Sequence, residues 1–165
     1  MHASHEVDSG HATHGKGGHP YRSLLIMAGL SLLSMYILMY AMVDVIGNVY
    51  TSLNQFYMAA LMTAPMVVIE LALMRGMYTN RKWNAVIMGA SVAAGLIAFL
   101  LIRQQTAIGD REFLRSMIPH HAGAILMCNQ ADLNDPRIQE LCRGIVAGQQ
   151  AEIDLMKAKL AELGR

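Results

Sequence analysis

Three long apolar runs constrain the fold of this chain more than any other feature of its sequence. They cover residues 23–43, 56–74 and 83–102, and Glu70 is the only charged residue inside them. Each run has the length of about 20 residues with which an α-helix crosses a hydrocarbon core of about 30 Å. Because lipid offers no hydrogen-bond partner to free backbone groups, we expect each run to be a transmembrane helix, in a membrane region covering residues 21–103.

Lysine and arginine residues in the loops predict how these helices are oriented. The loop between the second and third runs holds Arg75, Arg81 and Lys82, whereas residues 46–55 hold no basic residue. The positive-inside rule puts the basic loop in the cytoplasm. The N-terminal tail is then also cytoplasmic, and the segment after the third run lies outside, although Arg103 argues mildly against this orientation.

The first 20 residues differ sharply from the rest of the chain. Glycine, histidine, serine and threonine dominate them, and Val7 is their only large aliphatic residue after Met1. We expect a disordered tail, because such a segment cannot bury enough apolar surface to fold. Its histidines suit loose binding of divalent metals, although a merely solvated tail is an equal alternative. They are His2, His5, His11, His14 and His19.

Residues 104–165 predict an antiparallel helical hairpin. Charged residues return there, and apolar residues become periodic at helical spacing. We expect Asp110 to cap the first helix, and Asp135 with Pro136 to begin a second helix that ends near Leu163. The predicted apolar stripe of the second helix comprises Ile138, Leu141, Ile145, Ile153, Met156 and Leu160.

The first of these helices carries the strongest candidate ligands. Met117, His120, His121 and Met127 lie on neighbouring parts of its surface at about 100° per residue. Thioether and imidazole groups together suit copper, especially Cu(I). An amphipathic helix with two polar histidines at its edge explains the same pattern, because adjacent histidines cannot point the same way.

Across the predicted hairpin, residues whose numbers sum to about 270 lie level. This places Gln149 opposite His121, and Glu152 and Met156 within about a turn of the histidine-bearing face. A polar helix edge is the alternative interpretation. Cys128 and Cys142 also lie level, so a disulfide, two free buried thiols and a thiolate metal site all remain open.

Methionines also recur in the second apolar run. Met58, Met62, Met66 and Glu70 follow one another every four residues and so form one stripe on a helix. A carboxylate inside a membrane is costly and indicates a functional site by default. The stripe suits passage of a soft cation, but methionines that simply fill helix contacts explain it as well.

The segments DREFLRSMIPHHAGAILM (110–127) and QQAEIDLM (149–156) resemble a bacterial family of unknown function, the one numbered 305. The resemblance implies a ferritin-like helical domain that binds copper. Members of that family are often exported or membrane-anchored and associated with copper tolerance. The resemblance carries over six metal ligands: Met117, His120, His121, Met127, Glu152 and Met156. Apart from the resemblance, Gln149 and Asp110 are candidates to hold those ligands by hydrogen bonds, and Gln149 or Glu152 is an alternative Cu(II) ligand.

Together these features predict an all-α membrane protein of a bacterial cytoplasmic membrane. The single hairpin is half of a four-helix bundle, so we expect a homo-oligomer, most simply a dimer. The expected function is binding of Cu(I), with Ag(I) or Cu(II) as alternatives, in buffering, resistance or delivery to metal-handling partner proteins. We expect neither an enzyme nor a nucleic-acid partner, because no catalytic motif appears and the net charge is only +1.

Two other functions remain open. Three spans, a histidine-bearing tail and a methionine stripe resemble the Ctr-type copper transporters, although those place the tail outside. A protein that only assembles a complex through its helices is the third possibility.

Overall fold

The computed structural model describes residues 20–164, and these residues form helices and no strand. The all-α class predicted from the sequence is therefore confirmed for the described residues. In chain order the elements are α1 (Pro20–Leu38), the 3₁₀ helices η1 (Met39–Met42) and η2 (Ile46–Asn48), α2 (Leu53–Leu73), α3 (Arg81–Gln104), α4 (Asp110–Gln130) and α5 (Pro136–Glu162). The histidine-rich tail predicted for residues 1–20 lies almost wholly outside this range.

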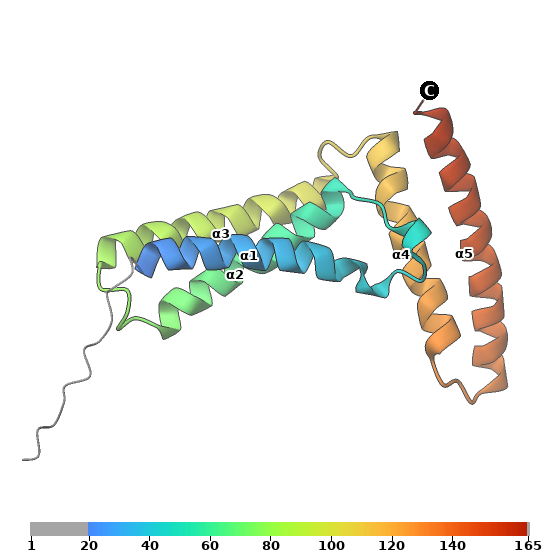
Figure 1. Ribbon diagram of the computed structural model, residues 1–165, viewed down its shortest axis with the longest axis horizontal. Coiled ribbons are helices and arrows are strands. Elements are labelled where there is room, and N and C mark those ends of the chain that lie inside the picture. Colours follow the sequence, from blue (N-terminus) through green and yellow to red (C-terminus); the bar gives the residue numbers. More distant parts are fainter. Residues whose placement is uncertain (1–19, 165) are drawn as a thin grey trace, which may run out of the picture.

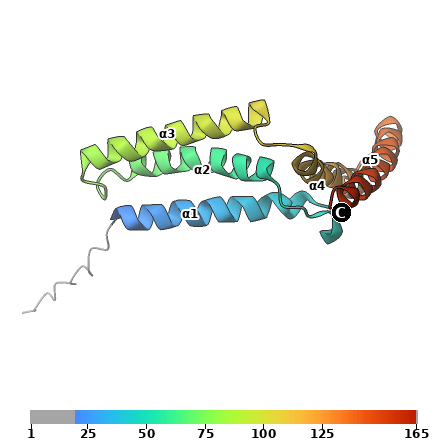
Figure 2. The same cartoon turned by 90° about the horizontal axis from the view of Figure 1, so that it is seen from above.

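Three helices are long and apolar enough to cross a membrane, as the sequence predicts. They are Pro20–Met42, Leu53–Leu73 and Arg81–Gln104. Figures 1 and 2 show them side by side, and α2 contacts both α1 and α3. Close packing of α2 on α3 depends on Gly95, because a Cβ there would lie 3.1 Å from the Cβ of Ala64. We call α1 to α3 the three-helix bundle.

The last turn of the first span is a 3₁₀ helix rather than an α-helix. Residues Met39 to Met42 form η1, and the chain then turns through η2 to reach α2. Ser52 begins α2 by accepting a hydrogen bond from the backbone N–H of Gln55. This capping ends the connection and fixes where the second span starts.

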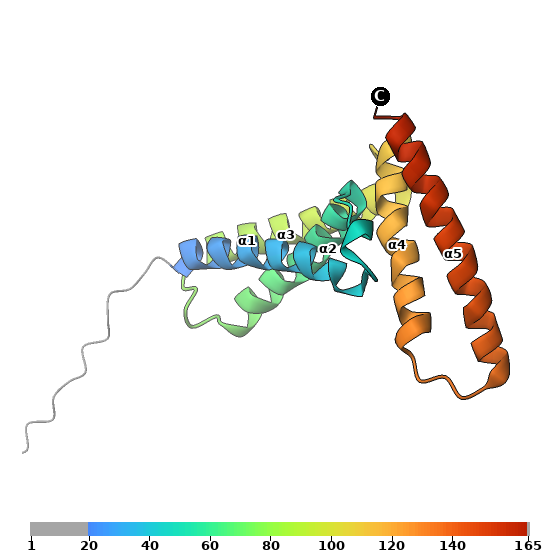
Figure 3. The same ribbon diagram turned by 45° about the vertical axis from the view of Figure 1, so that its right-hand side comes forward.

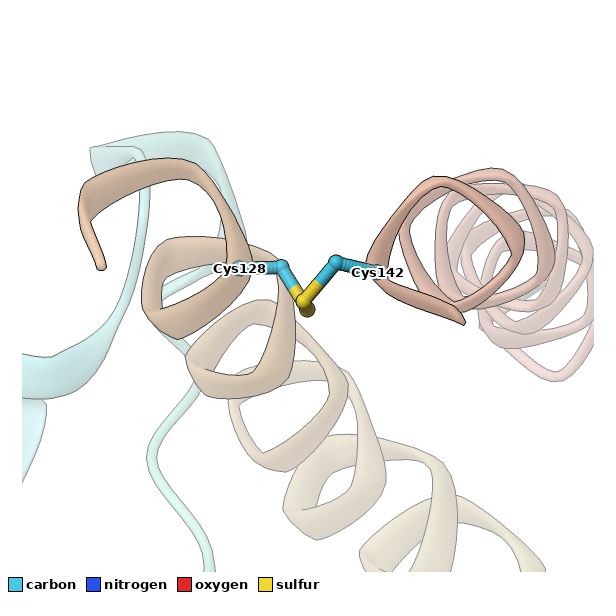
Figure 4. The surroundings of a disulfide bond; sticks show 2 residues. All are labelled: Cys128 and Cys142. Carbon is cyan, nitrogen blue, oxygen red and sulfur yellow. A yellow bond between two sulfur atoms is a disulfide. The ribbon is translucent and has the colours of Figure 1, made fainter. Parts of the chain in front are cut away.

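Helices α4 and α5 lie side by side, run in opposite directions and cross the end of the three-helix bundle (Figures 1 and 3). We call them the α4–α5 pair. Their shared core consists of Ile118, Ala122, Ile125, Ile153 and Met156, all buried. A disulfide between Cys128 and Cys142 also joins the two helices (Figure 4), with the Cα atoms 5.3 Å apart.

Two residues of the predicted α5 stripe lie outside this core. Ile138 is 47% exposed and Leu141 is 61% exposed, so their assignment to the apolar stripe was wrong. At 100° per residue, Leu141 lies about 120° around the helix from Ile153. Ile138 is level with the loop that follows α4, where the partner helix has already ended.

The caps of the pair agree only in part with the sequence prediction. Asp135 accepts a hydrogen bond from the backbone N–H of Arg137 at 2.8 Å and precedes Pro136, as predicted. The N-cap of α4 is Gly109, so the prediction of Asp110 as cap was wrong. Asp110 instead lies in the first turn of α4 with Glu112. Both carboxylates stabilise the helix there, because they interact favourably with the positive end of the helix dipole.

Candidate metal-binding site

Helix α4 is held against the three-helix bundle by direct polar contacts. The backbone N–H of Leu53 donates to Glu112 Oε2 at 3.1 Å, and Asn54 Nδ2 donates to Ser116 Oγ at 3.3 Å. At the other side of the contact, a Cβ on Gly123 would lie 3.4 Å from the carbonyl oxygen of Met42. Glycine at this position therefore lets the end of the first span lie directly against α4.

This contact forms a groove of about 490 Å³ between α4 and the ends of the first two spans. We call it the methionine groove, because five of its twelve lining residues are methionines. Its lining comprises Met39, Met42, Asn54, Gln55, Met58, Ser116, Met117, Pro119, His120, Gly123, Ala124 and Met127. The groove thus combines the family-type residues of α4 with residues far away in the sequence.

Sulfur and imidazole groups dominate the donors that the groove offers. Met117, His120 and Met127 come from α4, and the other three thioethers come from the bundle. Pro119 lies at the buried side of the same turn, so α4 reaches the groove with a proline immediately before His120. Because thioethers are soft ligands, this lining favours a soft cation over Mg²⁺ or Ca²⁺.

The remaining predicted ligands lie between α4 and α5 instead. His121 Nδ1 is 3.0 Å from Glu152 Oε2, which is an ion-pair distance. The geometry is not that of a hydrogen bond, and this buried nitrogen has no hydrogen-bond partner among the described residues. Met156 is buried in the shared core nearby. The structure therefore divides the six predicted ligands into a groove group and an interhelical group.

Other sequence candidates are spread over the molecule. Asp110 lies beside Lys159 and Glu162 near the C-terminal end of α5, about three helical turns from His121. In the second span, Met58 lines the methionine groove, whereas Met62 is 47% exposed on the outer surface. Gln149 is half-buried on α5.

At the opposite end of the bundle, Glu70 has a protein partner. Tyr78, in the loop between α2 and α3, donates its hydroxyl to Glu70 Oε1 at 3.4 Å. Burial raises the pKa of Tyr78, and the nearby Glu70 carboxylate adds to this increase. This pairing gives Glu70 a structural role in joining the end of α2 to the following loop.

Within residues 20–164, no three histidine, cysteine, aspartate or glutamate side chains come together as a metal cluster. Sequence reasoning also missed two groove methionines, Met39 and Met42, which lie in the first apolar run and were not singled out there. A signal was nevertheless present. The odd number of spans puts the end of the first span on the same side as α4, where its methionines meet the histidine-bearing helix.

Over residues 20–164, the fold and groove define a class of protein: an all-helical structure in which three helices able to cross a membrane meet a C-terminal helix pair at a methionine-rich junction. Residues 74–160 match the family model described as domain of unknown function (DUF305). The match covers more than half of the chain, so the chain belongs to this family. The match begins before α3, whereas the sequence resemblance rests on residues 110–156.

One similar protein is uncharacterized protein L153 of Acanthamoeba polyphaga mimivirus. The two chains are 36% identical over 119 residues, which cover 71% of this chain and 76% of the viral protein. No solved structure matches the chain.

Proposed function

We propose that this chain is a membrane-anchored protein that binds Cu(I), or Ag(I), in metal buffering, resistance or delivery. The observation that carries the proposal is the methionine groove, which Met117, His120 and Met127 of α4 line together. The proposal is for binding and transfer of the ion rather than for catalysis.

The chemistry of these donors fits the proposed ion. Thioether sulfur is a poor ligand for hard cations but a good one for Cu(I), and imidazole is compatible with the same ion. Met127 is 53% exposed and His120 is also exposed, so both side chains are accessible to an ion that enters from solution. An accessible site suits a protein that must release its cargo.

The interhelical group is the competing location for the ion. His121, Glu152 and Met156 supply an imidazole, a carboxylate and a thioether, and the carboxylate makes this group better suited to Cu(II). His120 belongs to the groove group and His121 to the interhelical group. Single substitutions of these two histidines therefore distinguish which group binds the ion.

The experiment uses the full-length protein in detergent and titrates Cu(I) against a coloured competing chelator. We expect His120→Ala to weaken Cu(I) binding at least about tenfold, since changes that only support a ligand already cost 10- to 100-fold. His121→Ala should change the affinity much less. Met77→Leu removes an exposed thioether in the α2–α3 loop, outside the groove, and should leave the affinity unchanged.

Each outcome has a clear meaning. A large loss with His121→Ala and none with His120→Ala would move the site to the interhelical group. Absence of stoichiometric Cu(I) binding by the unsubstituted protein would reject copper binding and favour a protein that only assembles a complex.

The same proposal includes an orientation. We place the α4–α5 pair outside the bacterial cytoplasmic membrane and the N-terminal tail in the cytoplasm. The disulfide between Cys128 and Cys142 supports this, because disulfides persist in oxidising compartments. The basic residues Arg75, Arg81 and Lys82 lie at the opposite end of the bundle, as the positive-inside rule requires.

We also propose that two copies associate through their α4–α5 pairs into a ferritin-like four-helix bundle. Leu141 and Leu155 support this, because both are large apolar side chains of α5 that are about 60% exposed in the single chain. Replacing both with glutamine should convert a dimer to a monomer in light scattering. A dimer that survives the double substitution would exclude this face.

Transport is the second candidate, and the position of Met58 favours it. This residue belongs both to the methionine groove and to the stripe that continues through Met62 and Met66. Because Met62 is exposed on the outer surface, a path along the stripe has to run between copies. Transport predicts copper flux in proteoliposomes that Met62→Leu abolishes; unchanged flux would remove the stripe from the path.

A further inference from the structure

We propose that Met39, Met42 and Met58 of the three-helix bundle are ligands of the same soft-metal site as His120 and the two groove methionines of α4. The inference rests on the proposed function. It adds that the bundle is a functional half of the site, so that a bound ion connects the apolar helices to α4.

The positions of these three side chains are the first argument. They come from the end of the first span and the start of the second, and all three line the groove opposite α4. Met42 is 52% exposed and Met58 is 38% exposed, and neither belongs to a hydrophobic core of the molecule. Core filling therefore does not explain why thioethers collect there.

The second argument is that the groove has fixed walls. Glu112 and Ser116 of α4 hold the start of α2 by hydrogen bonds, about one turn before Met58. Gly123 allows the backbone at Met42 to lie against the middle of α4. The two contacts lie on either side of His120 along α4, so the bundle thioethers lie opposite the part of α4 that carries His120.

The third argument is the chemistry of the complete set. Helix α4 alone offers two thioethers and one imidazole, whereas the groove as a whole offers five thioethers and one imidazole. A sulfur-rich set with no carboxylate in the lining favours Cu(I) and Ag(I) over Cu(II) and Zn²⁺. The bundle thus contributes three of the six sulfur and imidazole donors, and with them part of the affinity and of the selectivity of the site.

The test compares two triple variants of the full-length protein in detergent. Both replace three methionines with leucine, a nearly volume-conserving change. The groove variant carries Met39→Leu, Met42→Leu and Met58→Leu, and the control variant carries Met74→Leu, Met77→Leu and Met88→Leu, all outside the groove. Cu(I) affinity is measured by chelator competition, and sulfur ligation by X-ray absorption at the copper edge.

We expect the groove variant to bind Cu(I) at least about tenfold more weakly than the control variant, with fewer sulfur neighbours around copper. The single substitutions Met42→Leu and Met58→Leu should each give part of this loss, so the conclusion does not depend on the folding of one triple variant. A parallel titration with Ag(I) should give the same order.

Two results would overturn the inference in distinguishable ways. Equal affinity and equal sulfur ligation in the groove and control variants would show that α4 binds the ion without the bundle, while the proposed function stands. Failure of the unsubstituted protein to bind Cu(I) would reject the proposed function and this inference together.

Discussion

Removing the side chain of Ile153 should loosen the α4–α5 pair more than any comparable change on the surface of α5. Ile153 is fully buried against Ile118, Ala122 and Ile125. Ile153→Ala removes three carbon atoms, which at about 0.8 kcal/mol each corresponds to about 2.4 kcal/mol of lost transfer free energy. A cavity term raises the expected loss of stability to about 3–4 kcal/mol.

Ile138→Ala is the matched control for this prediction. The substitution is chemically identical and lies in the same helix, but Ile138 is 47% exposed, so its cost should stay below about 1 kcal/mol. Hydrogen exchange of the α5 backbone amides in the full-length protein, with the disulfide intact, measures the opening free energy of the helix. Equal effects of the two substitutions would refute the assignment of Ile153 to the shared core.

Three further predictions concern local contacts. Replacing Cys128 and Cys142 with serine should lower the stability of the α4–α5 pair by about 3 kcal/mol, measured by denaturation with and without reductant, because a loop of about 15 residues is no longer closed; reductant should have no effect on the double variant. Gly95→Val should separate α3 from α2 and lower the thermal midpoint in detergent, whereas Gly89→Val, with open space around it, should not. The Arg137 side chain lowers the pKa of Asp135. This carboxylate therefore stabilises the start of α5 at a pH above its unfolded pKa of about 3.9, and the stabilisation is lost as the pH falls through the lower folded pKa. Asp135→Asn should remove this part of the acid dependence of stability, and an unchanged pH profile would contradict the prediction.

The three apolar helices were predictable because their signal is local. A run of about 20 apolar residues has few structures open to it other than a membrane-spanning helix. The observed ends differ from the predicted ones by only a few residues, and the first span finishes in the 3₁₀ helix from Met39 to Met42. Asp135 and Pro136 were equally predictable, since a cap and its following proline specify a helix start without any tertiary contact.

The site was only partly predictable, because it depends on which side of α4 meets which neighbour. Helical spacing placed His120 and His121 next to each other but gave no means of assigning one to the groove and the other to α5. The assignment of Leu141 to the apolar stripe of α5 was wrong for a related reason. Its spacing fits the stripe only approximately, and its side chain lies too far around α5 to reach α4. Docking of α4 on the bundle decides the histidine case, and the side of α5 that packs on α4 decides the case of Leu141.

The crosswise position of the α4–α5 pair also sets how closely copies can approach one another. Helix α5 has 27 residues and is therefore about 40 Å long, whereas each helix of the bundle is only about 10 Å wide. In a bilayer, with the bundle along the membrane normal, the pair lies parallel to the surface and extends past the bundle (Figure 1). The area that each copy occupies in the membrane plane is then set by the α4–α5 pair. Two neighbouring bundles can contact each other across the long sides of their pairs, but not past the ends, where the pair projects beyond the bundle.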